Sequence, residues 1–118
     1  MAGEPRIIRA MLTDAERAVL AADPFGDMFK IVVDIAKEVV VAGGEFHADG
    51  ESMLIDDGSA QADLWGANYY PGRPAGSRLE YSALINIRPT QDNRGHLIAS
   101  EAVRTAVRKV VERLVGPA

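Results

Sequence analysis

Apolar residues recur at helical spacing near the C-terminal end of the chain. The positions i, i+3, i+4, i+7, i+8 and i+11 are occupied by Val103, Ala106, Val107, Val110, Val111 and Leu114. This spacing gathers the six side chains on one face of an amphipathic helix. Ser100 is suited to cap the first turn, Glu101 lies near the positive end of the helix dipole, and Gly116-Pro117 ends the helix. The pattern therefore predicts a C-terminal helix with one buried face.

Two further helices are predicted from residues that cap helix ends. Thr13 followed by Glu16 matches a capping box, in which each side chain accepts a hydrogen bond from the main chain of the other residue. This pair predicts a helix over Asp14–Ala22. Asp49 is a suitable N-cap for a shorter helix over Gly50–Asp57.

Other segments have the residue types and alternation of β-strands. They are Arg6–Leu12, Lys30–Ile35, Val39–Ala42, Asp63–Tyr70 and Leu79–Arg88. The second and third are rich in Val and Ile, which predicts that they form a hairpin. The competing interpretation is a single helix across residues 31–42, which the β-branched side chains disfavour.

Leu79–Arg88 is expected to form a strand whose two faces differ, because successive side chains of a strand point to opposite sides. One face would carry Leu79, Tyr81, Ala83, Ile85 and Ile87. The other would carry Glu80, Ser82, Leu84, Asn86 and Arg88. We expect the first face to pack under the helices, so that the polar groups of the second lie on the opposite side of the sheet.

The order of these elements is β-α-β-β-α-β-β-α. It predicts an α+β fold with two layers, in which a mostly antiparallel sheet has its helices packed on one face. A length of 118 residues indicates a single domain, residues 1–118. A composition of 47% hydrophobic and 25% charged residues is typical of a globular protein.

The composition also excludes several classes of site and partner. The chain has no cysteine and therefore no disulfide, thiolate metal site or cysteine nucleophile. A net charge of −4 is unfavourable for binding nucleic acid. No apolar run approaches the roughly 20 residues of a membrane-spanning helix, and the first residues lack a signal-peptide pattern. We expect a cytoplasmic protein with no cofactor, no nucleic-acid partner and no membrane contact.

Polar residues of the predicted strands and of the loop after Pro89 form a candidate ligand site. The ligand-binding candidates are Asp34, Asn68, Asn86, Arg88, Asn93 and Arg94. Such acceptors and donors suit a small polar or anionic ligand, and two arginines beside a loop can clamp a phosphate or carboxylate. The competing interpretation is a solvated sheet face held together by cross-strand pairs.

Glu45, His47 and Asp49 alternate in a second cluster. One histidine with two carboxylates matches no strong zinc pattern, so no metal site is predicted. Catalysis as a hydrolase or metal-free nuclease is the alternative function, with Glu45 or Glu80 as the base. His47 would then be the acid and Arg88 would stabilise negative charge. The competing interpretation is that Asp49 caps a helix and His47 bonds to a main-chain carbonyl.

Four segments carry recognisable motifs. They are VVDI (Val32–Ile35), GGEFHAD (Gly43–Asp49), DLWGANYYP (Asp63–Pro71) and EYSALINIRPTQDNR (Glu80–Arg94). Together they resemble a family of small bacterial proteins described only as a domain of unknown function. The resemblance implies no activity, substrate or cofactor. It draws attention to Asp34, Glu45, His47, Asp49, Trp65, Asn68, Glu80, Asn86, Arg88, Asn93 and Arg94. The family pattern favours a serine where this chain has Gly95-His96-Leu97, which weakens a loop-based site.

Because no established catalytic motif is present, binding is favoured over catalysis. We expect a binding or interaction module for a small polar or anionic ligand or for a protein partner. A homodimer, formed through an open edge or face of the sheet, is a third hypothesis.

Overall fold

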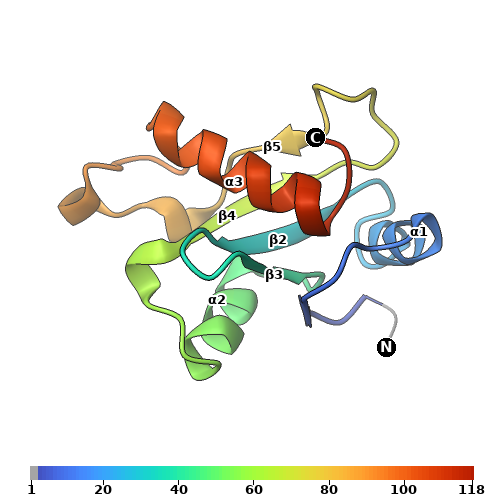
Figure 1. Ribbon diagram of the computed structural model, residues 1–118, viewed down its shortest axis with the longest axis horizontal. Helices are drawn as coiled ribbons and strands as arrows, with labels where there is room; N and C mark the ends of the chain where they lie inside the picture. The colour runs from blue at the N-terminus through green and yellow to red at the C-terminus, as the bar shows by residue number, and fades with distance from the viewer. Residues whose placement is uncertain (1–2) are drawn as a thin grey trace.

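A computed structural model describes residues 3–118 as five antiparallel strands with helices around them (Figure 1). The strands are β1 (Arg6–Ile8), β2 (Phe29–Asp34), β3 (Val39–Ala42), β4 (Leu64–Tyr69) and β5 (Leu79–Glu80). Their order in the sheet is β1-β3-β2-β4-β5, and every neighbouring pair is antiparallel. The predicted α+β class and antiparallel sheet are confirmed.

Three α-helices and three short 3₁₀ turns complete the described part of the chain. The helices are α1 (Asp14–Ala22), α2 (His47–Asp56) and α3 (Glu101–Leu114). The 3₁₀ turns are η1 (Gln61–Asp63), η2 (Leu84–Asn86) and η3 (Pro89–Gln91). None of the helices among residues 3–118 has the length and apolar character needed to span a membrane.

The caps of α1 and α3 are those that the sequence predicts. The Thr13 hydroxyl accepts from the Glu16 amide at 3.1 Å, and the Glu16 carboxylate accepts from the Thr13 amide at 2.9 Å. The Ser100 hydroxyl accepts from the amide of Val103 at 3.2 Å. The start of α2 differs, because its N-cap is the extended residue Phe46 and Asp49 already lies in the first turn. The prediction of Asp49 as N-cap is therefore wrong, although its carboxylate still lies near the positive end of the helix dipole.

β2 and β3 form the predicted hairpin, and Asp34 closes its turn. One carboxylate oxygen of Asp34 accepts from the amides of Ala36 and Lys37, both at 2.8 Å. The other oxygen accepts from the hydroxyl of Ser59 at 2.6 Å. Glu38 takes the left-handed conformation with a φ of 56°. The side chain of Asp34 thus provides the turn for which the sequence has no Asn-Gly or Asp-Gly signal.

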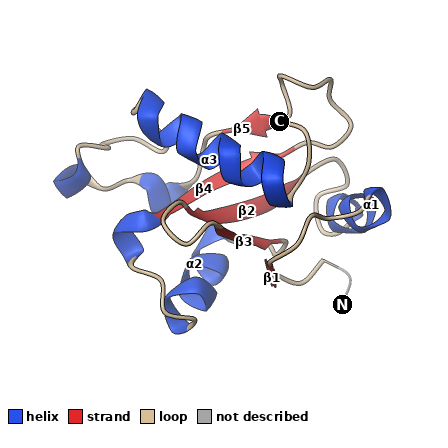
Figure 2. Ribbon diagram, viewed as in Figure 1, coloured by secondary structure: helices blue, strands red, loops and turns tan. Residues whose placement is uncertain are grey.

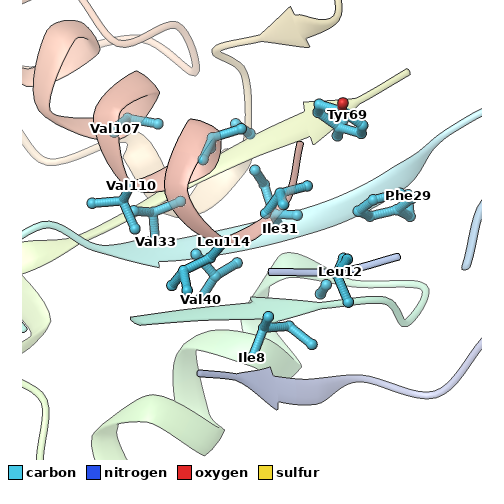
Figure 3. Packing of buried hydrophobic residues seen from close by; sticks show 14 of the residues in the cluster. Ile8, Leu12, Phe29, Ile31, Val33, Val40, Tyr69, Val107, Val110 and Leu114 are labelled. Atoms are coloured by element: carbon cyan, nitrogen blue, oxygen red, sulfur yellow. The ribbon is translucent and has the colours of Figure 1, made fainter. Parts of the chain in front are cut away.

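The helices lie on both faces of the sheet rather than on one, which corrects the predicted two-layer arrangement (Figure 2). On one face, Val107, Val110 and Leu114 of α3 pack over Ile31 and Val33 of β2 (Figure 3). Helix α1 adds Leu20 and Ala21 to the same core at one end of the sheet. On the other face, α2 contributes to a smaller core made of Val32, Val41, Leu54 and Leu64. Consecutive strand residues are apolar, so both faces of β2 and β3 need cover.

The predicted strand Leu79–Arg88 is present only at its first two residues. Beyond β5 the chain leaves the sheet and forms the 3₁₀ turn η2. Its apolar side chains do not share one face: Tyr81 packs on the α3 side and Ile85 on the α2 side. Ile87 is 45% exposed. The prediction of a two-faced strand is therefore wrong, and the structure shows what replaces it at the edge of β4.

Candidate functional site

The side chain of Asn86 takes the place of a strand residue beside β4. Its Oδ1 accepts from the amide of Gly66 at 2.8 Å, and its Nδ2 donates to the carbonyl of Gly66 at 3.0 Å. Two residues of neighbouring antiparallel strands exchange the same pair of bonds. Nδ2 also donates to the carbonyl of His96 at 3.1 Å, and Asn86 is fully buried. The carboxamide thus satisfies a sheet edge that the main chain has left.

Arg88 continues this role at the start of β4. Its Nη2 donates to the carbonyl of Leu64, and its Nη1 donates to the carbonyl of Gln61 at 2.9 Å. Its Nε donates to the carbonyl of Ile85 at 3.1 Å. The guanidinium was predicted to clamp an anion, but its N–H groups instead donate to carbonyl groups of the fold.

An aromatic ring and one carboxylate also lie next to Arg88. The guanidinium lies 4.8 Å from the centre of the Trp65 ring, and its Nη2 is 3.6 Å from Oε2 of Glu51. Burial lowers the pKa of Arg88, and the charge of Glu51 opposes that shift. This ion pair lies under the surface, between α2 and the edge of β4.

Asn93 organises the loop that follows Arg88. Its Nδ2 donates to the carbonyls of Asn86 at 2.8 Å and of Gly95 and Leu97 at 3.0 Å. Its Oδ1 accepts from the amide of Ala99 at 2.9 Å. Both polar atoms of the side chain are therefore committed to the loop. Among the predicted ligand residues, Arg94 is the exposed one that has no hydrogen bond within residues 3–118.

A second polar group, on Asn68 and Glu80, lies closer to solvent. Nδ2 of Asn68 donates to Oε1 of Glu80 at 2.7 Å, and the hydroxyl of Tyr70 donates to the same oxygen at 3.4 Å. Nε2 of His47 lies 2.8 Å from the carbonyl oxygen of Ala67. We call His47, Asn68, Tyr70 and Glu80 the Asn68–Glu80 cluster. Three of its members come from β4, β5 and the residue after β4, and α2 supplies the fourth.

Asn68 carries the unusual feature of this cluster. The residue is 8% exposed, and its Oδ1 is a buried acceptor that has no hydrogen-bond partner among residues 3–118. A buried acceptor without a partner costs about 1–3 kcal/mol. The amide cannot simply turn over, because Nδ2 would then no longer face the Glu80 carboxylate.

Burial and neighbouring charge fix the protonation states within the cluster. Burial lowers the pKa of His47, and the positive charge of Lys30 adds to this effect, while the Ala67 carbonyl and the neighbouring side chain of Asn68 oppose it. Burial also raises the pKa of Tyr70, with a further contribution from the charge of Glu80. Near neutral pH the cluster therefore presents a neutral imidazole and a phenol that donates a hydrogen bond.

A comparison with known protein families assigns the chain to one of them. The family model described as "Protein of unknown function (DUF5674)" matches residues 6–114. The chain belongs to this family. No curated protein and no solved structure matches the DUF5674 chain. Membership confirms the predicted likeness to a family of unknown function and adds no activity or ligand.

The structure divides the predicted Glu45, His47 and Asp49 group of this DUF5674 protein. Glu45 and Asp49 lie on the wall of a hollow of about 250 Å³ beside the N-terminal segment. His47 turns instead to the carbonyl of Ala67, as the competing interpretation of the sequence expects. Within residues 3–118, no three His, Asp or Glu side chains are grouped so that they could hold a metal ion.

One exposed pair of side chains in the DUF5674 chain is not indicated by any pattern in its sequence. Oγ of Ser82 and Nδ1 of His96 lie 2.7 Å apart. The two residues are 14 positions apart, and they meet because residues 81–83 run antiparallel to residues 96–98. A pattern within one segment does not indicate that two distant segments run side by side. The pair could be predicted only from knowledge that these two segments are in contact.

The lowered pKa of His47 predicts a pH dependence of stability for the DUF5674 protein. Because the pKa of His47 in the folded chain lies below the ordinary histidine value of 6.5, the unfolded chain takes up the proton first as the pH falls. We expect the free energy of unfolding in urea to decrease between about pH 7.5 and about pH 5.5. A His47→Gln variant should lose most of this decrease. Glu16, whose pKa is lowered mainly by the Thr13 amide, titrates below this range. A wild-type stability that is level or rises toward about pH 5.5 would contradict the assignment.

Proposed function

We propose that this protein is a binding module for a small polar ligand that docks on the Asn68–Glu80 cluster. The observation that carries the proposal is the buried Oδ1 of Asn68, whose side chain lies near His47 but which accepts no hydrogen bond from the described residues. A ligand that donates a hydrogen bond to this oxygen recovers the cost of leaving it unpaired. The neighbouring carboxylate of Glu80 is exposed and forms the solvent side of the site.

The chemistry of the cluster favours a ligand rich in hydrogen-bond donors. Glu80 offers an exposed carboxylate that Asn68 and Tyr70 already orient. His47 is kept neutral by burial, so the positive charge near the cluster comes from Lys30 and Arg73. Because the unpaired oxygen of Asn68 and the carboxylate of Glu80 are both acceptors, we favour an amine, amide or polyol over a phosphate or carboxylate. This choice narrows the sequence-based expectation of a polar or anionic ligand.

The alternative function, a hydrolase or metal-free nuclease, takes second place for physical reasons. Its charge stabiliser, Arg88, donates to carbonyls of the fold and faces Glu51. Its acid, His47, has a lowered pKa, so only a small fraction of His47 is protonated near neutral pH and can deliver a proton.

A homodimer stays a prediction, which the sedimentation mass of the purified protein tests.

A thermal-unfolding screen tests the binding proposal. The probes are ethanolamine, acetamide and glycerol, with phosphate and acetate as anionic comparators. A binding probe at a hundredfold excess over its Kd adds about 2.7 kcal/mol to the stability of the folded state. We expect a concentration-dependent rise in Tm with at least one donor-rich probe and no comparable rise with the anions.

Matched variants locate the site. Glu80→Gln removes the charge of the cluster and should abolish the rise in Tm. Glu112→Gln changes an exposed carboxylate of α3 and should leave the rise intact. The proposal fails if no donor-rich probe stabilises the wild type, or if Glu80→Gln responds as the wild type does.

A further inference from the structure

The Ser82–His96 pair is held in place by the main chain on both sides. The amide of Ala83 donates to the carbonyl of His96 at 3.0 Å, and the amide of Ile98 donates to the carbonyl of Tyr81 at 3.0 Å. These bonds form a short antiparallel ladder that brackets the pair. The pair therefore lies on a fixed frame, although both side chains can be reached from solvent.

A hydroxyl within hydrogen-bond reach of an imidazole nitrogen is the arrangement of an activated nucleophile and its base. For Ser82 to donate to His96, Nδ1 must be the unprotonated nitrogen and Nε2 must carry the proton. We propose that Ser82 and His96 form a nucleophile–base pair that hydrolyses carboxylic esters. This activity goes beyond ligand binding at the Asn68–Glu80 cluster, because it uses neither Asn68 nor Glu80.

The reaction balances with water as the other reactant. Oγ of Ser82 attacks the ester carbonyl while its proton passes to Nδ1 of His96. The carbon–oxygen bond to the alcohol then breaks, and His96 returns the proton to the leaving alkoxide. This step leaves an acyl group on Ser82. A water molecule, deprotonated by His96, attacks that acyl group. The bond between the acyl carbon and Oγ then breaks, His96 returns the proton to Oγ, and the carboxylic acid and the free serine result.

The neighbours of Ser82 indicate the class of ester. Ala83 is extended, with φ −167° and ψ 149°, so Ser82 and Leu84 lie on the same side of the chain. Leu97 is the cross-strand partner of Ser82. Leu84 is 78% exposed and Leu97 is 50% exposed. An ester with a short apolar acyl chain would cover these two side chains while its carbonyl meets the hydroxyl.

The pair lacks the third group of a complete catalytic triad. Within the described residues no hydrogen bond to Nε2 of His96 is present, so nothing but the ladder orients the ring. We therefore expect turnover well below that of a full triad and a reaction with mechanism-based probes that is easier to observe than steady-state hydrolysis.

The test is covalent labelling with an alkyl fluorophosphonate, followed by intact-mass measurement and peptide mapping. The serine oxygen forms a bond to phosphorus, and fluoride leaves. We expect one label on each wild-type chain, on the peptide that contains Ser82. Ser82→Ala should remove the label, and His96→Gln should slow labelling by roughly a hundredfold, the scale of general-base catalysis. Ser77→Ala, which changes another exposed serine, should label as the wild type does.

A second readout separates serine catalysis from simple attack by an imidazole. With p-nitrophenyl butyrate, the wild type should release p-nitrophenolate faster than Ser82→Ala, while Ser77→Ala matches the wild type. The circular-dichroism spectrum and Tm of each variant establish that it is folded. The proposal is overturned if the wild type takes no label, if Ser82→Ala labels or hydrolyses as fast as the wild type, or if His96→Gln labels at the wild-type rate.

Discussion

Replacing Gly66 with alanine should destabilise the folded state by about 3 kcal/mol or more, at the upper end of the effects of overpacking. A Cβ at this position would lie 2.4 Å from Cβ of Ala83 and 3.1 Å from Cδ2 of His47. Neither neighbour can easily retreat, because Ala83 is held by the carbonyl of His96 and His47 begins α2. Urea unfolding, followed by circular dichroism, measures the loss as a lower midpoint.

Two further variants make the Gly66 result specific to this contact. Gly72→Ala adds the same methyl group where nothing lies within 4 Å of it, so its midpoint should stay near that of the wild type. Ala83→Gly removes the opposing methyl group and should restore part of the stability when it is combined with Gly66→Ala. A double-mutant cycle separates this coupling from the cost of Ala83→Gly alone. A Gly66→Ala midpoint equal to that of Gly72→Ala would show that Ala83 does not lie over Gly66.

Asn86→Ala is expected to cost about 3–5 kcal/mol, because each buried polar group that loses its partner costs about 1–3 kcal/mol. The substitution leaves the amide and the carbonyl of Gly66 without the carboxamide that now bonds to both. It also removes the bond to His96 that joins the two segments of the loop. The free energy of unfolding in urea gives the effect directly.

Leu84→Ala is the matched control for Asn86→Ala, since both residues belong to η2. Leu84 is 78% exposed, so its truncation should change stability by no more than about 0.5 kcal/mol. Similar losses for the two variants would mean that the carboxamide of Asn86 contributes nothing beyond the shape of η2.

The elements predicted best are those whose cause is local in the sequence. The apolar series of α3 repeats over three turns, and the capping box of Thr13 and Glu16 lies within four residues. The strands β2 and β3 follow from their β-branched residues, and the side chain of Asp34 forms the turn between them. Each of these signals is complete within its own segment, so no knowledge of the rest of the fold is needed.

The prediction of a strand over Leu79–Arg88 was wrong although apolar and polar residues do alternate there. The main chain of β4 at Gly66 bonds to a side chain instead of to the main chain of a neighbouring strand. Asn86 can exchange both strand-type bonds with Gly66 through its side chain, which leaves its own main chain free to turn. The alternation of apolar and polar residues indicates which side chains would share a face if the chain were extended. It does not indicate that a side chain takes the place of a strand. The prediction that all helices pack on one face of the sheet was also wrong, because α2 covers the second face, which is apolar as well.

The candidate site depends on contacts between distant segments. Asn68 meets Glu80 through the register of β4 and β5, and Ser82 meets His96 through a ladder that follows a loop. Sequence alone named Asn68 and Glu80 but did not pair them, and it left His96 without a place. For His47, the bond to a main-chain carbonyl was one of two interpretations, and it is the one that the structure has.

A side chain, not a strand, completes the edge of β4 at Gly66. An NMR experiment that detects scalar coupling across hydrogen bonds measures this pairing. We expect a correlation between the amide nitrogen of Gly66 and the side-chain carbonyl carbon of Asn86. A correlation from Gly66 to a main-chain carbonyl of residues 81–88, as in a continuous strand, would contradict it.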